Sequence, residues 1–475
     1  MKKLLSILFI ISTVCTANNL PDLGDYGSTV VSSHDESLIA RQILYQVNQS
    51  QNIVRDIEIS DYLESIGLKL IRNSSDPGRK IQFFIVNDPT INAFAMLGNI
   101  IGVHTGLFLS ANSESELSSV LAHEIAHITQ RHIVRFLAQQ DRITTEGLII
   151  TALAILLSRG SADLGSGAFL GGNAYAMQQN LDFTREHEKE ADRVGIQILH
   201  RSGFDVRASA DFFKTLQKGN QFSIGAAPSF LRTHPITSDR INDINARLED
   251  FSYKQRIENP NFYFIKGKIR AFIGRKKTVI NILEKNIKNK AYLNEAGERY
   301  ALAYAYIRNK EFDKAYIQIK KLLDFSIKSP MLIQLQATFL TQVGREQEAK
   351  SILKVGLKKY PGYRSFIYGL AENYIEDDES LKAIRLLENY KIKFSQDPNL
   401  YLFISKAYSS QGKKLLQYEN MAEYFYYKFN LQEAINQMDL AVKANDGNFY
   451  EKSRVEARLK QLKNEEALYV KFYDK

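Results

Sequence analysis

Residues 121–132, LAHEIAHITQRH, place three histidines and one glutamate in one short stretch. The segment HEIAH matches the pattern H-E-x-x-H, with His123 and His127 four residues apart. On a helix this spacing turns the two imidazoles apart by only about 40°, so both can face one ion. Glu124 lies about 100° from His123 and can reach a water molecule without binding the metal. The pattern predicts a zinc site in which Glu124 accepts a proton from water during attack on a carbonyl.

The third histidine of this stretch is not expected to be a ligand. His132 follows His127 by five residues. It is therefore turned about 140° away from the ligand face of a continuous helix. We expect it to pack or to form a hydrogen bond elsewhere.

A catalytic zinc ion takes three protein ligands and one water, so another element must supply a ligand. The segment FTREHEKEADRVG, residues 183–195, offers several candidates. Glu188 and Asp192 are four residues apart, so on a helix one could bind the metal while the other supports the site. Spacing alone does not choose between Glu188 and His187.

The elements that must position these residues follow from hydrophobic periodicity and helix caps. A helix is predicted for 57–72, and three short strands for segments bounded by turn residues: 80–88, 91–96 and 100–106. Ser113 and Glu116 have capping-box spacing, so a helix should start there and run through His123 toward Gln140. A second helix of this half is predicted for 182–201. We expect an α+β zincin-like metalloprotease domain that is mostly helical with a small sheet.

The second half of the chain has no histidine from about residue 260 onward and carries an internal repeat. Three alanines, Ala315, Ala349 and Ala383, are spaced 34 residues apart. In each repeat a large residue stands nine positions before this alanine, and a small residue stands three positions before the large one. The period of 34 residues resembles the tetratricopeptide repeat and predicts an all-α solenoid with a concave binding surface. The pattern returns after an excess of 17 residues, which predicts an extra helix, and the degenerate segment 263–287 precedes the array. The repeat positions are Ala303, Tyr306, Ala315; Ala337, Leu340, Ala349; Ala371, Tyr374, Ala383; and, after the excess, Ala422, Phe425 and Ala434, with Pro361 at the end of one unit.

Composition and the N-terminal segment limit the remaining possibilities. The chain has 475 residues, 44% hydrophobic residues and a formal net charge of +9, without an aromatic–basic nucleic-acid motif. Residues 1–17 have the pattern of a cleaved secretory signal peptide and contain Cys15, the only cysteine. If this segment is removed, the mature chain has no cysteine and no disulfide, and His, Asp and Glu must hold any metal. The alternative is a lipoprotein anchored through Cys15. The apolar segment 148–157 is too short to span a membrane, which argues against an integral-membrane prenyl-protein protease.

HEIAH, then FTREHEKEAD about sixty residues later, then THPITSDRI, resemble the HtpX- and CaaX-protease-like zinc peptidase family. The resemblance covers essentially the whole mature chain and is closest to a periplasmic branch that joins the protease to tetratricopeptide repeats. In the family motif S-R-x-x-E-x-E-A-D the first glutamate is the third ligand, which implies Glu188. Asp192 would then support His123 or His127, and Thr184 keeps the hydroxyl of the motif serine.

The same resemblance implies further site residues. The histidine of THPITSDRI, His234, would be a fourth, regulatory ligand that holds the enzyme inactive. Arg240 of this segment would support the site or stabilise the oxyanion. The residues Asn92, Ala93, Phe94 and Ala95 resemble an N-A-F-A edge strand that pairs with an extended substrate. Residues 97–99, Leu-Gly-Asn, depart from the P-G-G that is usual in the family, which leaves the local turn open.

These observations predict a signal peptide (1–17), a zinc metallopeptidase domain (18–255) and a tetratricopeptide-repeat domain (256–475). The resemblance implies a periplasmic endopeptidase with one zinc ion per chain and chaperone-like activity. It would act in assembly and quality control of outer-membrane β-barrel proteins. Its expected partners are misfolded or stalled outer-membrane proteins and the barrel-assembly machinery, with peripheral membrane contact and no nucleic acid. The alternative is a binding or chaperone scaffold whose protease site is silent.

Overall fold

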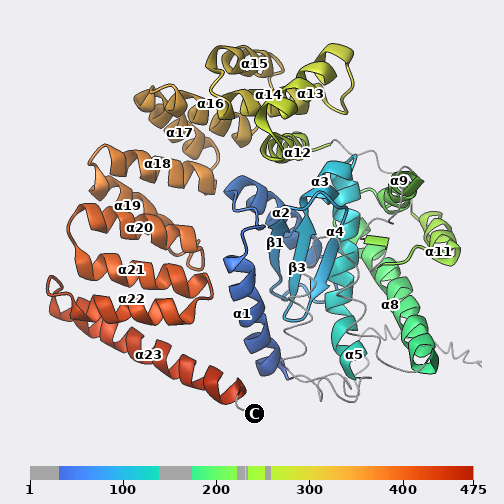
Figure 1. Ribbon diagram of the computed structural model, residues 1–475, viewed down its shortest axis with the longest axis horizontal. Helices are drawn as coiled ribbons and strands as arrows, with labels where there is room; N and C mark the ends of the chain where they lie inside the picture. Colours follow the sequence, from blue (N-terminus) through green and yellow to red (C-terminus); the bar gives the residue numbers. More distant parts are fainter. Residues whose placement is uncertain (1–31, 139–173, 222–229, 232–233, 252–257, 474–475) are drawn as a thin grey trace, which may run out of the picture.

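The computed structural model describes residues 32–138, 174–221, 230–231, 234–251 and 258–473 (Figure 1). A mostly helical first half with a small sheet is followed by a long helical array, as predicted. The predicted signal peptide, Cys15 and the apolar segment 148–157 lie outside the described residues. The elements of the first half are α1 (Ser33–Gln49), α2 (Ile57–Ile71), β1 (Gln82–Val86), β2 (Ala93–Met96), β3 (Ile100–His104), α3 (Thr105–Ser110), α4 (Glu114–Thr129), α5 (His132–Ala138), α8 (Ala174–Arg201), α9 (Ala208–Gln221) and α11 (Ser238–Leu248).

The three predicted strands form one sheet in the order β1-β3-β2. Strand β1 runs parallel to β3, whereas β2 runs antiparallel to it, with Ala95 opposite Ile101. Among the described residues β2 pairs with β3 alone, so it is an edge strand. The turn between them, Leu97-Gly98-Asn99, has φ values of 87° at Gly98 and 60° at Asn99. Gly98 also approaches Ala40 of α1 so closely that a Cβ atom would clash, which explains a glycine there.

Helix α4 carries HEIAH and packs against α8. The Ser113 side chain accepts a hydrogen bond from the backbone N–H of Glu116, which confirms the predicted start. The two helices approach closely because Gly195 of α8 has no side chain: a Cβ atom there would lie 3.2 Å from the His123 Cα. The predicted continuation of α4 toward Gln140 is wrong. The helix ends at Thr129, Arg131 has a φ of 54°, and α5 begins at His132.

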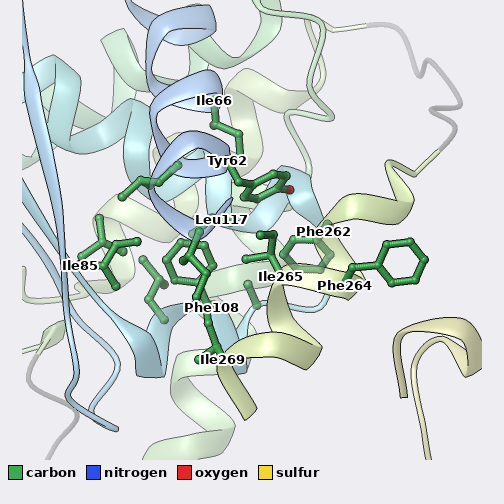
Figure 2. Packing of buried hydrophobic residues seen from close by; sticks show 14 of the residues in the cluster. Tyr62, Ile66, Ile85, Phe108, Leu117, Phe262, Phe264, Ile265 and Ile269 are labelled. Carbon is green, nitrogen blue, oxygen red and sulfur yellow. The ribbon is translucent and has the colours of Figure 1, made fainter. Parts of the chain in front are cut away.

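One large hydrophobic core joins the first half of the chain to the start of the array. It contains residues of α2, α3 and α4, such as Ile66, Phe108 and Leu117, together with Phe262 and Ile265 of α12 (Figure 2). Burial of these side chains is the main favourable contribution to folding. The predicted boundary between the two domains, at 255/256, falls within 252–257, outside the described residues.

The array consists of antiparallel helices that follow the predicted repeat. The alanines of the 34-residue pattern are all buried where paired helices meet, and the segment 263–287 forms the hairpin of α12 and α13. Helix α20 is the predicted extra helix, since it lies between the third unit (α18 and α19) and the unit of α21 and α22. The bounds are α12 (Pro260–Phe272), α13 (Lys276–Asn289), α14 (Glu295–Arg308), α15 (Phe312–Asp324), α16 (Pro330–Gln342), α17 (Glu346–Lys359), α18 (Arg364–Glu376), α19 (Ser380–Tyr390), α20 (Pro398–Ser410), α21 (Lys414–Tyr427), α22 (Leu431–Lys443) and α23 (Phe449–Tyr473).

The array curves around α1 and α2 of the first half (Figure 1). Near its middle, Arg364 of α18 forms an ion pair with Asp61 of α2. At its end, the Arg41 guanidinium of α1 lies 3.2 Å from Glu465 of α23. Within the described ranges no helix combines the length and apolarity needed to cross a membrane.

Candidate metal centre

Four buried side chains from three parts of the chain converge on one point. His123 and His127 come from α4, Glu188 from α8 and His234 from the segment that precedes α11. The His123 Nε2 atom lies 3.1 Å from His127 Nε2, and each of these atoms lies 3.3 Å from an oxygen of Glu188. His234 Nδ1 lies 3.3 Å from His123 Nε2 and 2.9 Å from Glu188 Oε1.

These distances fit a tetrahedral metal site. Zinc binds nitrogen and oxygen ligands at 2.0–2.2 Å, so neighbouring ligands of a tetrahedral zinc ion lie ~3.3 Å apart. The four donors are imidazole nitrogens and a carboxylate, the types that zinc prefers in proteins without cysteine ligands. The donor set and its spacing can therefore hold one zinc ion. Of the two residues that spacing left open, Glu188 belongs to this group and His187 does not.

Glu124 lies beside the cluster and contributes no ligand atom to it. Its side chain is fully buried. The Oε2 atom accepts a hydrogen bond of 2.8 Å from the backbone N–H of Ala95, on edge strand β2. The Oε1 atom has no hydrogen-bond partner among the described residues and faces His234 Nε2 at 3.4 Å. One carboxylate oxygen is thus fixed, and the other is directed toward the ligand cluster.

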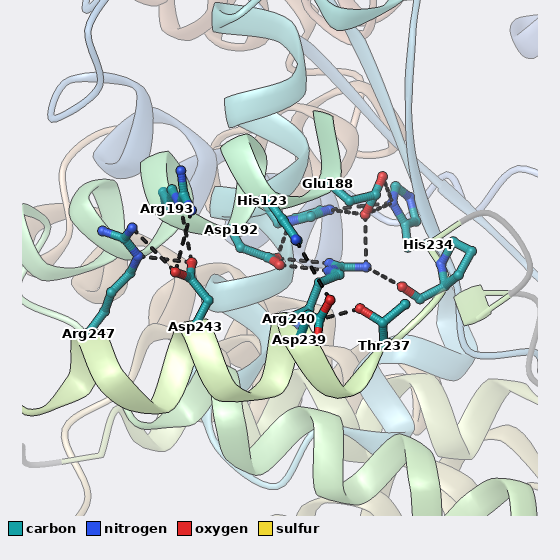
Figure 3. A network of polar contacts seen from close by, with 12 residues as sticks. His123, Glu188, Asp192, Arg193, His234, Thr237, Asp239, Arg240, Asp243 and Arg247 are labelled. Atoms are coloured by element: carbon teal, nitrogen blue, oxygen red, sulfur yellow. Dashed lines mark hydrogen bonds and ion pairs between the residues drawn. The ribbon is translucent and has the colours of Figure 1, made fainter. Parts of the chain in front are cut away.

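Asp192 contacts His123, and Arg240 contacts Asp192, on the side of the His123 ring away from the other candidate ligands (Figure 3). Asp192 Oδ1 lies 3.1 Å from His123 Nδ1, the ring nitrogen that faces away from the other ligands. Arg240 is buried and donates two hydrogen bonds to Asp192, at 2.7 and 2.8 Å, and one of 2.7 Å to the Pro235 carbonyl. Its Nη1 also lies 3.1 Å from Glu188. With the guanidinium engaged in these contacts, the geometry favours the supporting role predicted for Arg240 over oxyanion stabilisation.

The charges around the cluster favour a cation. Burial by itself would lower the pKa of His123, but Asp192 and Glu188 outweigh it and raise this pKa to about 10. Burial would likewise raise the pKa of Glu188, yet the nearby histidines hold it well below its usual range. Two carboxylates that retain their charge in a buried site attract positive charge, which a metal ion would supply.

His132, which the sequence predicted to interact elsewhere, lies directly against the cluster. Its Nδ1 atom is 2.9 Å from His127 Nδ1, and its Nε2 atom is 3.1 Å from Glu190 Oε2. The ring of His187 stacks on it at 4.2 Å. Burial and the neighbouring cationic groups lower the pKa of His132 to about 2, so it is uncharged at neutral pH. As predicted, His132 is not one of the four grouped side chains. The prediction that it would form its contacts away from the site is wrong.

Two residues contact the site although the sequence predicted no supporting role for them, and one of them, Glu190, was among the candidates in segment 183–195. Glu190 of α8 contacts His132, and Phe230 packs against the His234 ring at a centroid distance of 4.8 Å. Periodicity gave no signal for Glu190, because two residues turn a helix by about 200° and place Glu190 away from the face of Glu188. Phe230 precedes His234 by four residues and accepts a hydrogen bond from its backbone N–H, but no motif marked it.

A helix with H-E-x-x-H and a second helix with a glutamate, beside the edge strand of a small sheet, define a metalloendopeptidase. Residues 59–248 match the model of peptidase family M48.

The similarity to known proteins extends beyond this domain. The chain is 28% identical over 449 residues to the beta-barrel assembly-enhancing protease of Yersinia pestis, covering 94% of this chain and 91% of that protein. It is 27% identical over 452 residues to the protein of the same name from Escherichia coli (strain K12), covering 94% and 92%. The mitochondrial metalloendopeptidase OMA1 of Schizosaccharomyces pombe is 26% identical over 194 residues, covering 41% of this chain and 54% of that protein.

Proposed function

We propose that the chain is a zinc endopeptidase in which His123, His127 and Glu188 bind one zinc ion and Glu124 is the general base. The observation that carries this proposal is the convergence of the three ligand side chains, with donor atoms 3.1–3.3 Å apart, beside a buried carboxylate. Asp192 orients His123, and Arg240 holds Asp192 in place.

Zinc, when bound, polarises the scissile carbonyl and lowers the pKa of water. Glu124 accepts the proton of the attacking water at Oε1 and delivers it to the leaving amine. The Ala95 N–H holds the other carboxylate oxygen, so the base keeps its orientation while the proton moves. Burial of Glu124 excludes bulk water from its carboxylate and strengthens its electrostatic interactions.

The substrate would bind as an extended strand along β2. Along an antiparallel strand, the N–H and C=O groups of successive residues point alternately toward the neighbouring strand and away from it. In β2 those of residues 94 and 96 point toward β3. Ala93 and Ala95 therefore direct theirs toward the open edge. The Ala95 carbonyl and both the N–H and the carbonyl of Ala93 remain for pairing with a substrate. The scissile bond of a strand paired in this way would then lie over the group of candidate ligands.

His234 would regulate the site. Its Nδ1 atom belongs to the ligand group and its Nε2 atom lies 3.4 Å from Glu124 Oε1. In this position the ring lies between the Glu124 carboxylate and the other candidate ligands, where a substrate and water would need space. Movement of the segment around His234 would open the site.

We further infer a role in assembly and quality control of outer-membrane β-barrel proteins, with chaperone-like activity. The similarity to beta-barrel assembly-enhancing proteases along the chain supports this role. Exposed strands of stalled barrels suit an edge-strand site. The repeat array would recruit these substrates or the barrel-assembly machinery, and the predicted signal peptide would direct the chain to the periplasm, with peripheral contact at the outer membrane.

Metal analysis combined with a proteolysis assay tests the central proposal. Wild type should contain one zinc per chain and degrade an unfolded protein such as casein. Glu124→Gln should retain zinc and lose activity by about 10²–10⁴-fold. Cleavage at the wild-type rate in this variant would refute the assignment of the base. Full rescue of an envelope defect by the same variant would instead identify scaffolding as the main role.

A further inference from the structure

Beside the group of candidate ligands, a chain of hydrogen bonds leads from His127 toward the surface of the protein. His127 Nδ1 contacts His132 Nδ1 at 2.9 Å, and His132 Nε2 contacts Glu190 Oε2 at 3.1 Å. Arg135 of α5 donates to the same oxygen of Glu190 at 2.9 Å. His132 is only 3% exposed, whereas the Glu190 and Arg135 side chains reach solvent. The chain of contacts thus connects a buried candidate ligand to the surface of α8.

The positions of the protons along this chain follow from the chemistry of imidazole. If His127 binds a metal through Nε2, its Nδ1 carries the hydrogen and must donate it. His132 can accept it only through an Nδ1 atom without hydrogen. The hydrogen of the His132 ring is then on Nε2, where it is donated to the Glu190 carboxylate. Each ring has a single allowed tautomer, and every donor meets an acceptor.

We propose that His132 is a positioning residue for zinc binding: it fixes the tautomer and orientation of His127, and Glu190 fixes His132 in turn. The two histidines of HEIAH are therefore supported differently. A carboxylate, Asp192, contacts His123 directly, whereas His127 contacts the His132 ring and reaches a carboxylate only through that ring. Metal-binding histidines usually donate their second N–H to a carboxylate, a carbonyl or water.

The break between α4 and α5 makes this contact feasible. On a continuous helix His132 would be turned away from His127. The left-handed conformation of Arg131, with a φ of 54°, redirects the chain so that the first residue of α5 returns to the ligand face. The stacked ring of His187, inclined by only 8°, restricts the His132 ring to one plane. Three helices, α4, α5 and α8, thereby hold one imidazole.

Zinc affinity, measured by competition with a chelator, tests the proposal without relying on activity. The inference rests on zinc binding by His127, which is part of the proposed function. His132→Phe keeps an aromatic ring for stacking on His187 but removes the acceptor, and should weaken zinc binding about 10–100-fold. His132→Gln, which retains an acceptor and a donor, should recover part of that loss. His200→Phe is the matched control, because His200 also contacts a ring, that of Phe251, but at the far end of α8.

A second variant covers the case in which His132→Phe does not fold. Glu190→Ala should weaken zinc binding several-fold, whereas the exposed Glu186→Ala on the same helix should not change it. Unchanged affinity in both His132→Phe and Glu190→Ala, or in Glu190→Ala alone if the first variant is unfolded, would overturn the proposal. A wild-type chain that binds no zinc would overturn the proposed function as well, so the two failures are distinguishable.

Tautomers provide a readout that a purely structural role would not move. In the zinc-loaded protein with ¹⁵N-labelled histidine, NMR should show the hydrogen of His132 on Nε2 and that of His127 on Nδ1. A hydrogen on His132 Nδ1 would contradict the proposal directly.

Discussion

The backbone N–H of Ala95 donates a 2.8 Å hydrogen bond to Glu124 Oε2. This contact joins the open edge of the sheet to the carboxylate of HEIAH. The strand that would align the substrate is therefore the same element that orients the base. A displacement of β2 would change both substrate pairing and proton transfer.

Replacement of Ala95 by proline tests this connection. Proline removes the N–H and is tolerated on edge strands, so the sheet should form while Glu124 loses its anchor. We expect kcat to fall on the order of tenfold with zinc content unchanged. Ala93→Pro removes a neighbouring N–H of the open edge that does not contact Glu124, and it should raise KM more than it lowers kcat. Equal effects of the two substitutions on kcat would argue against the special role of Ala95.

Replacement of His234 by alanine should increase proteolysis. The change removes the ring that contacts both the ligand group and Glu124, and it leaves the three proposed ligands in place. Casein degradation should rise on the order of tenfold, which corresponds to about 1.4 kcal/mol. His200→Ala, on α8 away from the cluster, should leave the rate unchanged. Equal or slower cleavage by His234→Ala would refute a regulatory role.

A buried ion pair connects the first half of the chain to the array and should matter for stability. Lys268 Nζ lies 2.5 Å from Glu58 Oε2 and 2.7 Å from Asp56 Oδ2, and Tyr363 donates to Glu58 Oε1 at 2.6 Å. Lys268→Met leaves the Glu58 carboxylate buried without its cation, so the free energy of unfolding should fall by about 3–5 kcal/mol.

The matched comparisons for this ion pair are a double variant and a surface pair. Lys268→Met combined with Glu58→Gln should lose less stability than Lys268→Met alone, because the Glu58 charge, the more deeply buried of the two, is then removed and only the Asp56 carboxylate loses its partner. Arg345→Met, which breaks the exposed pair with Glu348, should leave the urea midpoint unchanged. If the double variant proves less stable than Lys268→Met alone, the buried charge is not the cause.

Lys266 gives the stability a pH dependence. Burial lowers its pKa from 10.5 to about 8, while its Nζ donates to the Ala111 carbonyl at 2.6 Å. The folded chain releases this proton at a lower pH than the unfolded chain. Between about pH 8 and pH 10.5 the unfolded state therefore binds more protons, and the contribution of Lys266 to the free energy of unfolding rises with pH.

The comparison of wild type with Lys266→Met at about pH 7.5 and pH 10 isolates this contribution. The stability of wild type relative to the variant should increase by on the order of 2 kcal/mol over this range. The same comparison with Lys277→Met, on the exposed face of α13, should stay constant. If the difference in free energy of unfolding between wild type and Lys266→Met stays constant or falls as pH rises, burial does not lower the pKa of this lysine.

The local features of the chain were predictable because they depend on near neighbours. The capping pair Ser113 and Glu116 marked the start of α4, and the 34-residue spacing of alanines marked the helix pairs of the array. Motif spacing also placed His123, His127 and Glu124 on one helix. These predictions rest on backbone geometry within a few turns, which the sequence encodes directly.

The failures arose where one residue changes the direction of the chain. Nothing in the sequence indicated that Arg131 would adopt a left-handed conformation, so α4 was extended too far and His132 was assigned to the wrong side. The choice of Asp192 as the partner of His123 rather than His127 likewise required the position of α8 against α4.

Spacing along the chain was enough to predict the H-E-x-x-H helix, the candidate ligands on it and the repeat period. The folded chain was needed to show that His234 reaches the candidate ligand group, that Ala95 contacts Glu124, that Arg240 contacts Asp192, and that His132 contacts His127. These contacts join residues whose separation is set by the packing of whole helices, and packing depends on the complete core rather than on any local pattern.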